Sequence, residues 1–177
     1  MTEGSWISLL IVALSGILSV VAVLIFFWKR ELLERRRVLH QQILQTTLPL
    51  RLQALERAAL FLERNDPNNL FPRLAPHTFK HTANLIQLVF QTVQEEYLHN
   101  SAYQIYMGPR VWIALRTAKN TLLQTLNATL AEYPPLHTPP IQWVEKFKEK
   151  WRTLSPDPFQ VAQAYLHSTM QELTQVN

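Results

Sequence analysis

The segment EEYLHN, residues 95–100, combines carboxylates with an imidazole at a spacing that could bind a metal ion. On a helix, Glu96 and His99 are three residues apart and Glu95 and His99 are four apart, so an acid and the imidazole share a face. Such a pair is half of a carboxylate-bridged two-metal site, which needs a second Glu-x-x-His and two further carboxylates. The sequence contains no second Glu-x-x-His. We therefore expect a polar helix end that satisfies groups on a neighbouring helix, with a metal site as the alternative.

Other routes to catalysis find less support in the sequence. His77 and His81 in HTFKH are four residues apart, but the segment lacks the intervening Glu of a zinc protease and a third ligand. The chain has no cysteine, which excludes disulfides, thiolate zinc sites and a cysteine nucleophile. Glycine occurs only at Gly4, Gly16 and Gly108, so phosphate-binding loops are absent. We predict that the protein is not an enzyme, has no cofactor and acts on no small-molecule substrate.

The elements that must position EEYLHN are predicted to be helices. Apolar residues recur every three or four positions after Pro49, from about Pro76 to Asn100, and again after Pro109. Proline-rich segments then separate two shorter helical patterns, IQWVEKFKEKW and PFQVAQAYLHSTMQEL. No segment alternates with a period of two, which predicts an all-α fold with a small bundle of four to five helices. We expect a main helical domain over residues 49–133 and a C-terminal helical extension over residues 134–177.

Residues 5–28 form an apolar run, with no charged residue between Glu3 and Lys29. At about 1.5 Å per helical residue, the run is long enough to cross a hydrocarbon layer of roughly 30 Å. A basic cluster follows the run instead of preceding it, which argues against a cleaved secretory signal. The sequence therefore predicts a transmembrane helix with an outward tip over residues 1–28, which continues into a basic juxtamembrane helical stalk over residues 29–48.

The distribution of basic residues predicts an orientation. Those that flank the apolar run are Lys29, Arg30, Arg35, Arg36 and Arg37, and none precedes it. Because basic flanks stay in the cytoplasm, we expect a single-pass protein of the cell inner membrane with its N-terminus outside and its C-terminal domain cytoplasmic. The bilayer would be a partner through anionic headgroups at this flank. Residues 38–177 carry twelve basic and ten acidic side chains, and this near-neutral balance argues against nucleic-acid binding.

Two surfaces are candidates for contact with other proteins. Small residues recur along the apolar run at Ser8, Ser15, Ser19 and Ala22, and small side chains allow membrane helices to pack closely. They predict a protein partner or a homo-oligomer through the transmembrane helix. Aromatic and apolar residues also bracket the Gly-Pro break, at Tyr103, Tyr106, Met107 and Trp112. They are a possible partner surface, and core packing is the alternative.

The chain resembles, in LPLRLQALERAALFLERNDPNNLFPRL and QEEYLHNSAYQIYM, an uncharacterised family of small single-pass membrane proteins of Bacteroidota-type bacteria. Members share an N-terminal membrane helix, an LPLRLQAYER-type helix and an REE-type segment that ends in QIY. This chain departs from the motifs at Leu55, Ala58 and Gln94. The resemblance covers most of residues 48–120 and implies the topology, but the family has no established activity.

These observations predict a non-catalytic, membrane-anchored helical scaffold or an accessory subunit of a membrane protein complex. The prediction depends on the missing phosphate loops, the missing cysteines and the incomplete ligand sets, combined with a chain rich enough in apolar residues to fold. The alternative is a metal-dependent enzyme or metal sensor built on Glu95, Glu96 and His99.

Overall fold

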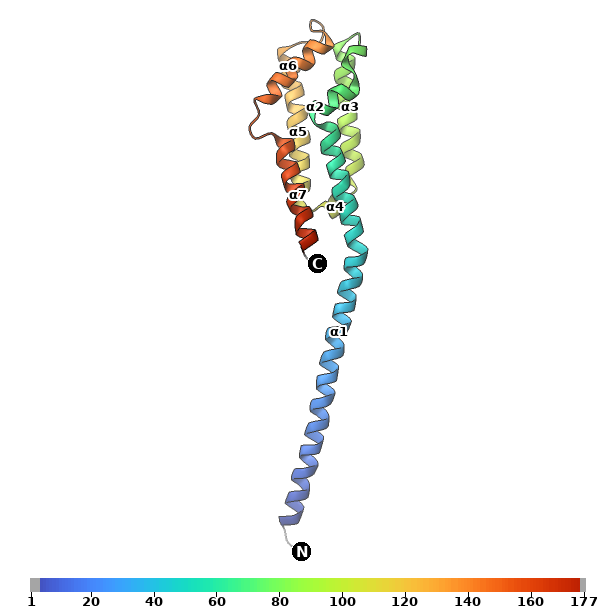
Figure 1. Cartoon of the computed structure of the whole chain (residues 1–177), viewed down its shortest axis with the longest axis vertical. Helices are drawn as coiled ribbons and strands as arrows, with labels where there is room; N and C mark the ends of the chain where they lie inside the picture. The colour runs from blue at the N-terminus through green and yellow to red at the C-terminus, as the bar shows by residue number, and fades with distance from the viewer. Residues whose placement is uncertain (1–3, 176–177) are drawn as a thin grey trace. The chain divides into compact units, whose positions relative to one another are not determined.

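The computed structural model describes the backbone of residues 4–175 and the side chains of residues 14, 16–35, 42 and 45–175. Within this part the chain is helical and contains no strand, which confirms the predicted all-α architecture (Figure 1). In chain order the elements are α1 (Gly4–Asn65), α2 (Pro67–Leu74), the 3-10 helix η1 (Pro76–Thr78), α3 (Thr82–Ser101), α4 (Gln104–Met107), α5 (Pro109–Glu132), α6 (Pro140–Arg152) and α7 (Pro158–Gln175).

The chain divides at Pro49 into two compact units. The first unit comprises residues 1–48, and the second, which we call the body, comprises residues 49–177. In its described part the first unit consists of α1 residues alone, whereas the body contains the end of α1 and all the later helices. The candidate sites described below lie within the body.

The predicted transmembrane helix is contradicted. Among the residues that the structure describes, no helix is long and apolar enough to cross a membrane. The described side chains of the apolar run are Leu14 and those from Gly16 to Trp28. At about 1.5 Å per residue, the stretch from Gly16 to Trp28 extends about 20 Å, less than the roughly 30 Å of a hydrocarbon layer. The predicted inner-membrane location, with its outward N-terminus and cytoplasmic domain, depended on this helix and is contradicted with it.

The basic flank of the apolar run is partly paired with its own acidic neighbours. Arg30 Nε lies 3.3 Å from Glu34 Oε1, and Arg35 Nη2 lies 2.7 Å from Glu31 Oε1. Both pairs join exposed residues one helical turn apart, which is a weak and salt-sensitive arrangement. Lys29 is also exposed, whereas the side chains of Arg36 and Arg37 lie outside the described residues.

The predicted stripe of small residues is described only in part. Ser19 and Ala22 are exposed, and the side chains of Ser8 and Ser15 lie outside the described residues. The large apolar side chains around Ser19 and Ala22 are exposed as well, for example Leu18 and Phe26 at 70% and 63%. The described side chains therefore do not form a packed helix–helix contact within this chain.

The core of the body is built from helices that are distant in sequence. Buried apolar side chains come from α1, α2, α3, α5, α6 and α7 and form one continuous cluster. An aromatic stack lies at its α6 side, where Trp143, Phe147 and Trp151 recur every four residues and their rings follow one another at 6.0 Å. Phe71 of α2 meets Phe147 edge to face at 5.1 Å, and Phe159 of α7 meets Trp151 at 5.7 Å. Residues 140–175 are thus part of the same core as α1 to α5.

Local sequence explains where the helices of the body begin. Asp66 caps α2, because its side chain accepts a hydrogen bond from the Asn68 backbone N–H at 2.8 Å, and Pro67 follows as the first helical residue. Gly108 separates α4 from α5 with a φ of +81°, a conformation that glycine adopts without strain. Pro109 then takes the first position of α5, as the sequence predicts.

Candidate functional site

The predicted Glu/His cluster lies in a polar cleft of about 680 Å³ between α1 and α3. The residues that line this polar cleft are Gln53, Glu56, Arg57, Leu60, Phe61, Arg64, Glu95, Glu96, His99 and Asn100. Acidic and basic side chains therefore face each other across it, which the sequence spacing within α3 alone does not reveal.

The Glu96 carboxylate is bonded through both of its oxygens. Oε1 accepts from Arg73 Nη1 at 3.0 Å, and Oε2 accepts from Asn65 Nδ2 at 2.7 Å. Arg73 also donates to the backbone oxygen of Arg64 at 3.2 Å, so it reaches the end of α1. Asn100 donates to the backbone oxygen of Glu96 at 2.7 Å. Glu96 thus joins α3 to the end of α1 and to α2.

His99 is engaged by an arginine of α1. Arg57 Nη1 lies 2.9 Å from His99 Nε2, and because a guanidinium can only donate, the ring nitrogen accepts. The same guanidinium lies over the ring of Tyr103, 4.6 Å from its centroid. The pair occupies the lone pair of Nε2 that a metal ion would need. Glu95 also lines the polar cleft, and its carboxylate accepts from Gln91 at 2.8 Å within its own helix.

The three predicted ligands therefore do not converge on one point. Among the described residues there is no group of three or more His, Cys, Asp or Glu side chains that could hold a metal ion. His77 and His81 are both exposed, at η1 and before α3. The arrangement resembles the polar helix end considered as the first interpretation of the sequence, in which charged side chains connect helices instead of binding a ligand.

The aromatic segment around the Gly-Pro break packs inward. Met107 is fully buried, and the side chains of Tyr103, Tyr106 and Trp112 are half-buried and rest on the core. Trp112 stacks on Tyr97 of α3 at 5.1 Å. The structure thus places these residues as the core-packing alternative describes, and the large apolar side chain that α4 leaves in solvent is Ile105, at 74% exposure.

Burial perturbs two titratable groups beside Trp112. The pKa of Tyr97 is raised by desolvation, and the nearby Arg116 offsets this only in part. The pKa of Lys119, whose ammonium lies 4.2 Å from the Tyr97 ring centroid, is lowered by desolvation and by Arg116. The raised pKa favours the neutral Tyr97 phenol, and its ring serves as an aromatic platform for the Lys119 ammonium.

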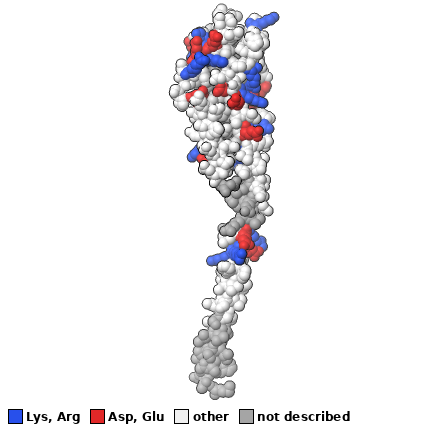
Figure 2. Space-filling model, viewed as in Figure 1, with Lys and Arg blue, Asp and Glu red and all other residues white. Residues whose placement is uncertain are grey.

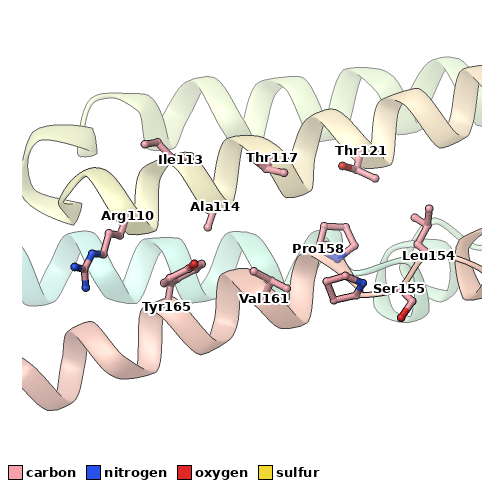
Figure 3. Close-up of a pocket in the computed structure, with 11 residues that line it drawn as sticks. Arg110, Ile113, Ala114, Thr117, Thr121, Leu154, Ser155, Pro158, Val161 and Tyr165 are labelled. Atoms are coloured by element: carbon pink, nitrogen blue, oxygen red, sulfur yellow. The ribbon is translucent and has the colours of Figure 1, made fainter.

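Sequence reasoning did not identify a groove of about 770 Å³ between α5 and α7 (Figure 3). We call it the α5–α7 groove, and its lining residues are Arg110, Ile113, Ala114, Thr117, Thr121, Leu154, Ser155, Pro156, Pro158, Val161 and Tyr165. On α5 the positions of Ile113, Thr117 and Thr121 are four residues apart and form one row. The signal that could have revealed the groove is Ile113, a large apolar residue outside the buried stripe that contains Leu115 and Leu122.

The α5–α7 groove is apolar along its length and charged at one end. Figure 3 shows Arg110 at one end of the row of lining residues and Leu154 and Ser155 at the other. Arg110 is the only charged residue among those that line the groove, and threonines and Tyr165 supply hydroxyl groups. On the face of the body shown in Figure 2, basic and acidic side chains lie close together in several places. The groove therefore combines exposed apolar surface with a single positive charge.

Comparison with known proteins identifies a family whose function is unknown. No curated protein and no solved structure matches the chain. Residues 4–173 match a protein family of unknown function, DUF7935, and this range covers nearly the whole sequence. The prediction from the LPLRLQALER and QEEYLHN segments that the chain belongs to an uncharacterised family is thus confirmed. The chain belongs to the DUF7935 family.

Proposed function

We propose that the protein is a non-catalytic helical binding module, a scaffold or accessory subunit that holds a segment of a protein partner in the α5–α7 groove. The observation that carries the proposal is the groove itself, which leaves apolar side chains in solvent. Ile113 and Tyr165 are 52% and 44% exposed on its rims. A contiguous apolar hollow on the surface is typical of an interaction site.

The dimensions of the groove fit a helix. Figure 1 shows α5 and α7 side by side in the body, and these two helices contact each other directly. From Arg110 to Thr121 the α5 side of the groove extends about 16 Å, which corresponds to about three turns of a helix laid along it. Small-molecule sites usually enclose most of their ligand, whereas the exposure of Ile113 shows that this groove is open. An amphipathic helix laid into an apolar groove is a common mode of protein recognition.

The polar cleft supports a non-catalytic role. Glu96 and His99 are the carboxylate and imidazole whose spacing on α3 best suits catalysis. Glu96 is bonded to Arg73 and Asn65, and His99 is bonded to Arg57. A general acid or base needs an atom that can reach a substrate, and here both carboxylate oxygens of Glu96 and the Nε2 of His99 already have partners within the fold. The resemblance in the LPLRLQALER and QEEYLHN segments supports a bacterial source for the protein. A bacterial cell is therefore the setting for the experiment below.

Photocrosslinking from inside the groove tests the proposal. A photoreactive phenylalanine analogue at Thr117 of the full chain should form crosslinks with one defined segment of a partner protein, identified by peptide mass spectrometry. The same analogue at Asn127, exposed on α5 but away from the groove, is the matched control. We expect Val161→Trp, which fills the groove from α7, to reduce the Thr117 crosslinks at least about tenfold, because it blocks the apolar contact area.

Two results would contradict the proposal. The first is an identical set of crosslinked peptides from Thr117 and Asn127 that Val161→Trp leaves unchanged. The second concerns the metal-dependent alternative: stoichiometric iron, zinc or manganese in the purified full chain, lost in His99→Ala, would favour an enzyme or a metal sensor. Circular dichroism of each variant shows whether the fold is retained.

A further inference from the structure

One end of the α5–α7 groove carries a positive charge without a partner among the described residues. Arg110 is exposed, and its guanidinium forms no ion pair and no side-chain hydrogen bond there. Some cations of the body are paired with carboxylates, for example Arg73 with Glu96 at 3.0 Å and Lys150 with Glu132 at 2.6 Å. Figure 3 shows the Arg110 side chain extending from α5 beside the groove. A segment laid in the groove would therefore bring its end close to an available guanidinium.

The rest of the lining offers no second charge. Ile113, Ala114 and Val161 present hydrocarbon surface, and Thr117 and Thr121 add hydroxyl groups of small side chains. A guanidinium binds carboxylate with two parallel hydrogen bonds, which makes the contact directional as well as attractive. Because the charged residue of the lining is at one end of the groove, an acidic residue at that end of a bound helix would strengthen binding. Apolar residues along the rest of the helix would contact the hydrocarbon lining. Charge complementarity of this kind fixes orientation and register.

We propose that the segment held in the α5–α7 groove is an amphipathic helix with an acidic side chain that pairs with Arg110. This inference rests on the proposed function and specifies its partner. The apolar side chains of that helix would follow the acidic residue at helical intervals of three, four and seven, and would contact Ile113 and Val161. The opposite orientation would place the acidic group at Leu154, where the groove lining has no cation and the adjoining pocket has Lys148 and Arg152 together with the acidic Asp157.

A displayed library of helical peptides with a randomised face is the probe. Peptides are selected on the purified full chain and counter-selected on Val161→Trp, so that only groove-dependent binders remain. The most enriched peptides are then synthesised in two forms, with Glu or with Lys at the position predicted to face Arg110. Fluorescence anisotropy gives the Kd of each form for the wild type, Arg110→Gln and Arg110→Glu. Arg116→Glu is the matched control, since Arg116 is an exposed arginine of the same helix that does not line the groove.

We expect the wild type to bind the Glu form about fivefold more tightly than the Lys form at low salt, because a partly exposed ion pair contributes up to about 1 kcal/mol. The preference should disappear in Arg110→Gln, reverse in Arg110→Glu, remain in Arg116→Glu and weaken with added salt. Groove-dependent peptides without any charge preference would overturn this inference and leave the proposed function intact. A selection that yields no groove-dependent peptide would overturn both.

Discussion

Replacing Phe147 with alanine is expected to lower the free energy of unfolding of the body by about 3–5 kcal/mol, the range for truncating a buried phenylalanine. The Phe147 side chain is fully buried at the centre of the aromatic stack. Its ring lies 5.1 Å from that of Phe71 and 6.0 Å from those of Trp143 and Trp151. Alanine would remove these contacts and leave a cavity that the surrounding rings cannot fill.

Urea denaturation followed by far-UV circular dichroism measures this loss. Lys148→Ala is the matched control, because Lys148 is the next residue of α6 and is partly exposed. We expect the control to change the free energy of unfolding by less than about 0.5 kcal/mol. If Phe147→Ala costs no more than Lys148→Ala, then α6 does not pack on the core as described.

Glu96→Ala is expected to cost about 1–3 kcal/mol of stability, the penalty for leaving a buried polar group without its partner. Asn65 is fully buried and donates to Glu96, and its Oδ1 already has no hydrogen-bond partner among the described residues. Arg73 would lose its carboxylate as well. The substitution thus removes one hydrogen bond from Asn65 and one from Arg73, which keep their bonds to the backbone oxygens of Phe61 and Arg64.

A double-mutant cycle separates this network from the neighbouring acid. Glu95→Ala removes an exposed carboxylate whose hydrogen-bond partner among the described residues is Gln91 of its own helix, so it should be close to neutral. Combining Glu96→Ala with Asn65→Leu should recover part of the loss, since the unsatisfied amide is then absent. Equal and additive losses from Glu95→Ala and Glu96→Ala would argue against a structural role that is specific to Glu96.

The helices of the body could be predicted well from the sequence because their signals are local. The three- and four-residue spacing of apolar side chains in α3 and α5, and Gly108 with Pro109 between α4 and α5, each require only neighbouring residues. The apolar run was misjudged for a related reason. Its composition suggested a separate span, whereas the structure has one helix from Gly4 to Asn65 whose described part contains no sufficient apolar stretch.

The environment of the candidate site could not be predicted in the same way. Glu96 pairs with Arg73 and Asn65, which are 23 and 31 residues away in the chain. The local spacing between Glu96 and His99 within α3 does not reveal these partners. The α5–α7 groove depends on how far apart two helices are held. No pattern within α5 or α7 alone encodes such a distance.

The aromatic stack of α6 also gives the body an intrinsic optical signal. Trp143 and Trp151 are held against Phe147 and Phe159 in fixed orientations, and immobilised aromatic rings in an asymmetric environment produce near-UV circular dichroism. Trp28 is 69% exposed, so its emission should lie at longer wavelength than that of the two buried indoles. The packing of the body's aromatic rings, those of α6 included, can therefore be followed in solution without any attached dye, in a part of the spectrum to which an exposed indole contributes little.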